Sequence, residues 1–393
     1  MVIDATKRVT DVVEGMHVTI ASGPAILGRP LAIPARAITG LVYGSIRGVT
    51  HVVGAAIDVV LAQLGPLLGK SAPGPERAAF VAALNGVVGD YLSETGNPLA
   101  IEMRLCHAGQ PLDVEKAALQ TALRAATGKL LVLVHGSSMN DLQWSRAGHD
   151  HGADLARDLG YTPIYLRYNS GLHISTNGRA FADLLERLVA EWPVPIEDFV
   201  IVGHSMGGLV ARSACHVGEQ ASQAWRTKLK TLVCIGSPHL GAPLERGGNW
   251  LELAIGLSAY SAPLARLAKL RSAGVTDMRH GNVLDEQWTG RDRFARATEL
   301  RKALALPEGV RCYAIAGTTT RAPAKKLRGD GIVPVESALG RHKRPELALA
   351  FPEDHQWIGY GIGHLELLNR SEVYETLRAW LPEVTRSGAP RAD

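Results

Sequence analysis

The segment DFVIVGHSMGGL, residues 198–209, places a serine where a side chain could act as a nucleophile. Four strand-favouring apolar residues, 199–202, precede it, and a helical pattern follows it. Gly203 and Gly207 flank Ser205 two positions away on each side, which is the GxSxG spacing of a nucleophile on a sharp turn between a strand and a helix. Glycine at both positions avoids collisions with the strand and the helix. Ser205 is therefore the predicted nucleophile, and a glycine-rich connection without chemistry is the alternative.

A serine hydroxyl needs a base, a group that orients the base, and donors for a developing oxyanion. Residues 130–134 form a predicted buried strand that runs into His135 and Gly136. The loop after such a strand lies beside the nucleophile, so the predicted oxyanion donors are the backbone N–H groups of Ser137 and Met206. His135 lies upstream of the serine and is predicted to pack its ring beneath this loop rather than to transfer protons.

The predicted base is His364. It follows a predicted last strand, 356–360, and opens a helical stretch, whereas His342 lies in a basic run and His355 precedes the strand. A loop after a strand can bring a histidine to the serine. A helix cap or a half-buried core histidine is the alternative for His364.

The predicted acid is Asp330, which lies between two glycines after the strand predicted at 311–317. From a tight turn its carboxylate could accept the ring N–H of His364 and fix the tautomer of that ring. An Asp-Gly turn without chemistry is the alternative reading. The alternative candidates for the acid of the triad are Glu336, Glu353 and Asp354.

Strands and helices alternate along the chain, and this alternation predicts an α/β protein with a mostly parallel central sheet and helices on both faces. The strands are expected at residues 99–106 (an edge strand), 130–134, 161–168, 199–202, 232–235, 311–317 and 356–360.

Five motifs, LVLVHG, GHSMGG, IGSPHLGAP, GDGIVPV and GIGHLELL, occur in this order over residues 129–381. Together they resemble the α/β-hydrolase superfamily, most closely bacterial lipases, esterases and the inositol-deacylase-like branch. The resemblance implies the α/β-hydrolase fold and a hydrolase that cleaves apolar esters with Ser205, Asp330 and His364 as its triad. Gly203, His204 and Gly207 would form the nucleophile elbow.

The expected reaction proceeds through an acyl-enzyme and needs no metal and no cofactor. A thioesterase or a polyester depolymerase with the same triad is the enzymatic alternative, because the fold does not fix the acyl group. A non-catalytic protein that binds a lipid or granule surface is the alternative of another class. Ser137 and Ser138 stand where many lipases carry a larger apolar residue, so the acyl chain length stays open.

The predicted domains are an N-terminal helical hairpin at 1–97, a catalytic domain at 98–245 and 302–383, a helical lid at 246–301 and a disordered tail at 384–393. An apolar stripe at every third or fourth position of residues 38–64 marks the first helix of the hairpin, and 75–92 marks the second. The hairpin is expected to pack on the hydrolase or on a second copy in a homodimer, or to contact a lipid or polymer surface. Apolar residues at 250–260 predict an amphipathic lid helix over the serine.

Charge and cysteine content exclude other classes of protein. The 42 basic and 38 acidic residues give a net charge of +4, which is too small to indicate nucleic-acid binding. The four cysteines are widely spaced, so no disulfide framework is expected.

His149, Asp150 and His151 are interpreted as a helix start rather than a metal site. The acidic, weakly apolar N-terminus does not resemble a secretory signal, which favours a cytoplasmic protein, with peripheral attachment to a membrane or lipid surface left open.

Overall fold

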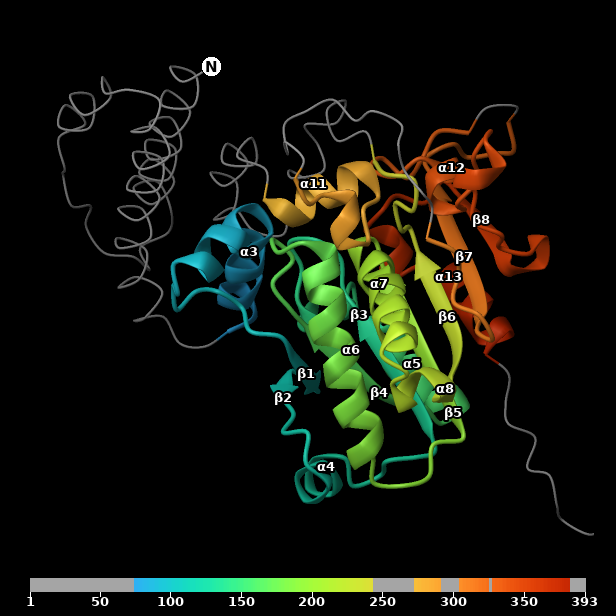
Figure 1. Cartoon of the computed structure of the whole chain (residues 1–393). Coiled ribbons are helices and arrows are strands. Elements are labelled where there is room, and N and C mark those ends of the chain that lie inside the picture. Colours follow the sequence, from blue (N-terminus) through green and yellow to red (C-terminus); the bar gives the residue numbers. More distant parts are fainter. Residues whose placement is uncertain (1–73, 243–271, 291–303, 325–326, 382–393) are drawn as a thin grey trace, which may run out of the picture.

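The computed structural model describes residues 74–242, 272–290, 304–324 and 327–381 (Figure 1). The first helix of the predicted hairpin, the amphipathic helix predicted at 250–260 and the predicted disordered tail all lie outside the described residues.

An eight-stranded mixed sheet in the order β2-β1-β4-β3-β5-β6-β7-β8 forms the centre of the described structure. Strands β3 to β8 pair in parallel, whereas β1 is antiparallel to both β2 and β4. The strands are β1 (Arg104–His107), β2 (Gln110–Pro111), β3 (Lys129–Val134), β4 (Thr162–Arg167), β5 (Asp198–His204), β6 (Leu229–Ile235), β7 (Arg311–Thr318) and β8 (Gln356–Tyr360). This sheet confirms the predicted α/β class with a mostly parallel sheet.

The sheet edge differs from the prediction of a single edge strand at residues 99–106. The strand starts later, at Arg104, and β2 rather than β1 forms the edge. A two-residue turn joins them, with φ values of 49° at Ala108 and 76° at Gly109. Two-residue hairpin turns of type I′ need positive φ at both central residues, and alanine rarely adopts it. The Ala-Gly pair therefore gives a weak turn signal in the sequence.

Helices cover both faces of the sheet. On one face lie α6 (Ile174–Glu191), α7 (Met206–Gln220) and α8 (Ala224–Lys228), which stand in front of the strands in Figure 1. On the other lie α5 (His151–Leu159) and α13 (Ser371–Trp380). Successive residues of a central strand point to opposite faces, and helices cover both, so residues 130–134 of β3 are all buried. In β3, Leu130 and Val132 join the α6–α7 core and Leu131 and Leu133 join the α5–α13 core.

The remaining elements connect or flank these layers. They are α3 (Pro75–Glu94), α4 (Lys116–Ala122), α11 (Ala273–His280), α12 (Val335–Ala338) and the 3-10 helices η3 (Asp141–Trp144), η5 (Asp285–Gln287), η6 (Pro345–Leu347), η7 (Glu353–His355) and η8 (Glu366–Leu368). Helix α3 occupies the segment predicted for the second helix of the hairpin. All four cysteines are buried free thiols. Among the described residues, no helix is both long and apolar enough to cross a membrane.

Candidate active site

Ser205 lies on a strained turn between β5 and α7. Its φ of 54° and ψ of −121° fall in a region that residues with a side chain rarely adopt. The backbone N–H of Ser205 donates to the carbonyl oxygen of Ile235 at 2.8 Å, which ties the turn to the end of β6. This is the backbone geometry expected of a nucleophile elbow.

The two flanking glycines are required by close contacts of the backbone. A Cβ on Gly203 would lie 2.5 Å from the backbone nitrogen of Gly208, at the start of α7. A Cβ on Gly207 would lie 2.1 Å from the carbonyl oxygen of Val134, at the end of β3. The turn can therefore form only when both positions lack a side chain, as the GxSxG spacing predicts.

The loop after β3 lies directly beside Ser205. A Cβ on Gly136 would lie 3.1 Å from the Cβ of Ser205. Within the described part of the chain, the backbone N–H groups of Ser137 and Met206 have no hydrogen-bond partner, and a free N–H is expected at the first residue of a helix. Two backbone donors near the serine are thus available to an oxyanion.

His135 has the packing role predicted for it. Its buried ring stacks on Tyr168, with ring centroids 4.3 Å apart, and Nδ1 lies 2.8 Å from the carbonyl oxygen of Gly136. Since a carbonyl oxygen can only accept, Nδ1 carries the proton. Burial lowers the pKa of His135 to about 4, so the ring is neutral at pH 7.

Asp330 and His364 form a buried hydrogen-bonded pair. The Oδ2 of Asp330 lies 2.6 Å from the Nδ1 of His364, and the side chains are 1% and 4% exposed. The other carboxylate oxygen, Oδ1, accepts from the backbone N–H groups of Ile332 and Val333 at 2.9 and 2.8 Å. The loops are also joined by the N–H of His364, which donates to the carbonyl oxygen of Asp330 at 3.0 Å. With the Nδ1 proton directed at the carboxylate, Nε2 is left free to act as a base.

Ser205 and His364 are not hydrogen-bonded to each other in the described structure. Such catalytic contacts are often long without substrate and shorten in the reactive complex. Ser205 follows β5, Asp330 follows β7 and His364 follows β8, so all three lie at the carboxyl ends of parallel strands. The fold therefore gathers them at the carboxyl end of the sheet.

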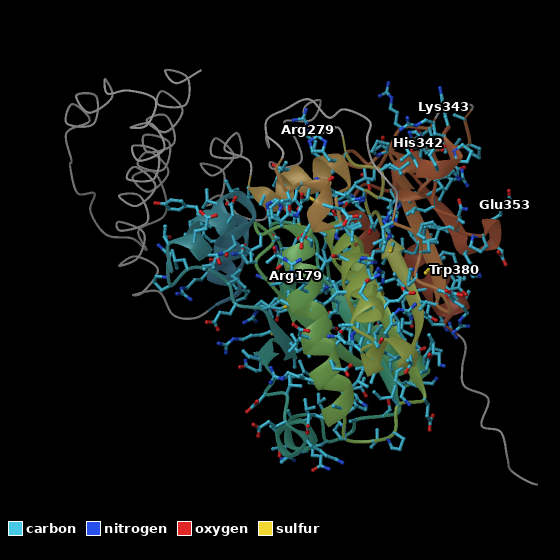
Figure 2. All side chains as sticks on the ribbon, viewed as in Figure 1. Arg179, Arg279, His342, Lys343, Glu353 and Trp380 are labelled. Atoms are coloured by element: carbon cyan, nitrogen blue, oxygen red, sulfur yellow. The ribbon has the colours of Figure 1, made fainter. Side chains whose placement is uncertain are left out.

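The other histidines and acids considered in the sequence lie elsewhere. His355 precedes β8, and its Nδ1 is 3.1 Å from the carbonyl oxygen of Cys312 at the start of β7, the opposite end of these strands. His342 is exposed, and Figure 2 shows it at the outer surface. The alternative acids Glu336, Glu353 and Asp354 are all exposed.

Two buried histidines hold the loop that carries His364. The Nε2 of His204 lies 3.2 Å from the carbonyl oxygen of His364, and the Nε2 of His151 lies 2.9 Å from that of Leu367. Burial lowers the pKa of His151 to about 4 and that of His204 well below its usual value, so both rings are neutral N–H donors. The Nε2 of His149 lies 2.7 Å from the Nδ1 of His151, which carries no proton when Nε2 is the donor.

The contact between His151 and Leu367 is not predicted from the sequence, where the His149–Asp150–His151 run indicates a helix start or, alternatively, a metal site. The helix start is confirmed, because Asp150 caps α5 by accepting from the N–H groups of Gly152 and Ala153. Among the described residues, no group of three metal-ligating side chains is found. A contact across 216 residues of sequence leaves no local signal.

Residues 125–305 match the PGAP1-like alpha/beta domain family. No protein of curated function matches the sequence. Solved structures similar to this chain include a Bacillus licheniformis lipase in its mature form, at 14% identity and a TM-score of 0.42, covering 64% of this chain and 91% of that one. The naproxen esterase of Bacillus subtilis is 13% identical, with a TM-score of 0.37 and coverages of 65% and 84%. A thioesterase from the prodiginine biosynthetic pathway in Streptomyces coelicolor is 18% identical, with a TM-score of 0.37 and coverages of 70% and 94%.

Proposed function

Because this chain belongs to the α/β-hydrolase superfamily, we propose that it is a serine hydrolase that cleaves carboxylic esters through an acyl-enzyme. The observation that carries the proposal is the buried Asp330–His364 pair, with Oδ2 and Nδ1 2.6 Å apart. The pair lies at the carboxyl end of the sheet, where Ser205 has the strained elbow conformation. A buried carboxylate that orients a histidine at this end is the arrangement that activates a serine.

In the first half of the reaction, Ser205 Oγ attacks the ester carbonyl carbon and its proton passes to Nε2 of His364. The backbone N–H groups of Ser137 and Met206 bind the oxyanion of the tetrahedral intermediate. Asp330 stabilises the imidazolium through its bond to Nδ1. When the intermediate collapses, the C–O bond to the alcohol breaks and the leaving oxygen takes the proton from His364.

In the second half, water attacks the acyl-enzyme. His364 accepts a proton from the water, and a second tetrahedral intermediate forms in the same oxyanion site. Its collapse breaks the bond to Ser205 Oγ, which recovers the proton, and the carboxylic acid leaves. The same steps would cleave a thioester or a polyester, so these substrates remain alternatives for the same site.

Labelling with a fluorophosphonate tests the nucleophile directly. The intact enzyme should gain the mass of one adduct, and peptide mapping should place it on Ser205. Ser213 lies on the same helix, with its Oγ 2.7 Å from the carbonyl oxygen of Val283, and gives the matched control. Ser213→Ala should still be labelled, whereas Ser205→Ala should not. A full-length protein that stays unlabelled and hydrolyses no ester would support the non-catalytic surface-binding alternative.

A screen against esters and thioesters of graded chain length would then identify the substrate class. Turnover confined to thioesters would replace the ester proposal with the thioesterase alternative while keeping the triad. Turnover of polyester particles would favour the depolymerase alternative.

A further inference from the structure

Helix α3 packs a face of small residues directly against the loop that carries the predicted oxyanion donor. A Cβ on Gly86 would lie 1.9 Å from the Oγ, 2.8 Å from the Cβ and 2.9 Å from the Cα of Ser138. The last of these atoms belongs to the backbone, which cannot move aside as the end of a flexible side chain can. The helix and the loop are therefore as close as a glycine allows.

Ser138 is a strained residue next to Ser137. Its φ is 59°, in the left-handed region that residues other than glycine rarely adopt. Such a conformation persists only where the surrounding structure imposes it. The backbone N–H of Ser138 donates to Ser170 Oγ at 2.9 Å, whereas its own buried Oγ has no hydrogen-bond partner among the described residues. Ser170 on one side and Gly86 on the other thus confine this turn.

Helix α3 is held in place by both neighbouring segments. Asn169, in the loop after β4, donates its side-chain N–H to the carbonyl oxygen of Gly89 at 2.8 Å. Ser272, which caps α11, donates its hydroxyl to the carbonyl oxygen of Gly86 at 2.7 Å, and Asp90 accepts from the N–H of Ala273 at 3.0 Å. Figure 1 shows α3 and α11 beside each other.

We propose that α3 is part of the catalytic apparatus and that Gly86 is a positioning residue for the oxyanion hole. By setting the position of Ser138, Gly86 fixes the direction of the adjacent Ser137 N–H, a donor in the proposed ester hydrolysis, on which this inference rests. The helix lies upstream of the residues that match the PGAP1-like domain, so this support is supplied by a separate part of the chain.

The test compares Gly86→Ala with a matched glycine in another helix. Gly218 lies in α7, and a Cβ there would lie 2.7 Å from the ring of Trp225, far along the helix from Ser205. In the full-length protein, Gly86→Ala should lower kcat on p-nitrophenyl acetate by about 10- to 100-fold, with little change in KM, because the donor acts mainly in the transition state. It should weaken inhibition by a boronic acid by a similar factor. Gly218→Ala should lose stability but keep kcat.

A second substitution separates positioning from general damage to the fold. Ser138→Gly removes the Oγ and Cβ that an alanine at position 86 would meet, and glycine accepts the positive φ. The 2.9 Å contact with the Cα of residue 138 remains, so the double variant should recover part of the kcat that Gly86→Ala loses, relative to the Ser138→Gly single variant. A double variant that recovers none of the lost kcat, when it and Gly86→Ala are both folded, would overturn the role of this contact.

Hydrogen–deuterium exchange gives a readout that does not depend on activity. Amides of residues 135–141 should exchange faster in Gly86→Ala than in wild type or Gly218→Ala. Unchanged exchange together with unchanged kcat in Gly86→Ala would overturn the inference and leave the proposed hydrolase intact. If the wild type hydrolyses no ester, the proposed function fails, and faster exchange would then show only that α3 holds the loop, which would overturn the catalytic role.

Discussion

At the scale of single residues, chemistry depends on atoms held by several hydrogen bonds at once. Asp330 is the clearest case, because each of its two carboxylate oxygens has a separate task. Oδ1 accepts two backbone N–H groups and holds the side chain in its turn, while Oδ2 is left to the ring of His364. A carboxylate with this many donors stays in one orientation, so it can orient the histidine.

Replacing the nucleophile should abolish turnover without unfolding the protein. Ser205→Ala removes a hydroxyl that makes no hydrogen bond in the described structure, so little stability is lost. Removal of a triad member typically costs on the order of 10⁴-fold or more in kcat. Initial rates on an activated ester, with circular dichroism to verify folding, test this prediction. An alanine variant that keeps a tenth of wild-type kcat would mean that another residue is the nucleophile.

The acid and the base can be tested against neighbours of the same type. Asp330→Asn and His364→Ala should each reduce kcat by several orders of magnitude. The first removes the carboxylate that orients the His364 ring, and the second removes the ring. His355→Ala and Asp354→Asn should keep near-normal kcat, since η7 lies at the opposite end of β8. Steady-state kinetics on the four purified variants decides the matter. Equal losses in both pairs would contradict the assignment.

At the scale of elements, the loop after β8 is held by two buried histidines, His151 and His204, whose pKa values are lowered by burial. His151→Leu removes the donor to the carbonyl oxygen of Leu367 and leaves that buried oxygen unpaired. A shift of the His364 loop should lower kcat by about 10-fold with little change in KM, since small misplacements at a reacting centre are costly.

His107→Leu is the matched control for this prediction. It also breaks a 2.9 Å contact between a histidine ring and a carbonyl oxygen, that of Pro163, but at β1, on the far side of the sheet from β8. Its kcat should stay near that of wild type. If both variants lose kcat equally, or neither does, the loop of His364 does not depend on His151 in particular.

The sequence predicted those elements whose signal is local. The strand before Ser205, the two glycines and the Gly-Asp-Gly turn each depend on a few adjacent residues, and their described geometry agrees with the prediction. The contacts of His151 with Leu367 and of Gly86 with Ser138 join segments far apart in the chain. Periodicity and spacing carry no information on such pairs, so only the folded structure places α3 against the loop after β3.

At the scale of the whole molecule, buried neutral histidines make stability depend on pH. Burial lowers the pKa of both His135 and His151 to about 4, below the value of about 6.5 expected in the unfolded chain. Between these values the unfolded state binds more protons, so acid favours unfolding. The free energy of unfolding should therefore fall as the pH drops from 6.5 towards 4, by up to about 1.4 kcal/mol per pH unit for each such histidine.

Urea denaturation at pH 7, 6 and 5 measures this slope before most carboxylates titrate. His151→Leu removes one of the titrating groups, so its free energy of unfolding should change less steeply with pH than that of wild type. Parallel profiles for the two proteins would show that His151 does not become protonated on unfolding in this range.

The N-terminal region offers the last test, because α3 is the part of the predicted hairpin whose contacts the structure describes. Deleting residues 1–73 keeps α3, its contacts with Ser138 and Asn169, and every proposed catalytic group, so turnover of a soluble short-chain ester should stay near wild type. Mass in solution or co-sedimentation with liposomes should change if the deleted segment serves assembly or surface attachment.

Deleting residues 1–95 also removes α3, and with it the carbonyl oxygens of Gly86 and Gly89 that accept from Ser272 and Asn169. This second fragment should aggregate, since exposed apolar patches promote association. If it stays soluble it should lose most of its kcat, because the loop after β3 loses the contact between Gly86 and Ser138 and keeps only the one with Ser170. The comparison uses expression yield, light scattering and initial rates on the same ester. A soluble, fully active fragment starting at residue 96 would show that α3 is dispensable. An inactive fragment starting at residue 74 would extend the catalytic body into the first 73 residues.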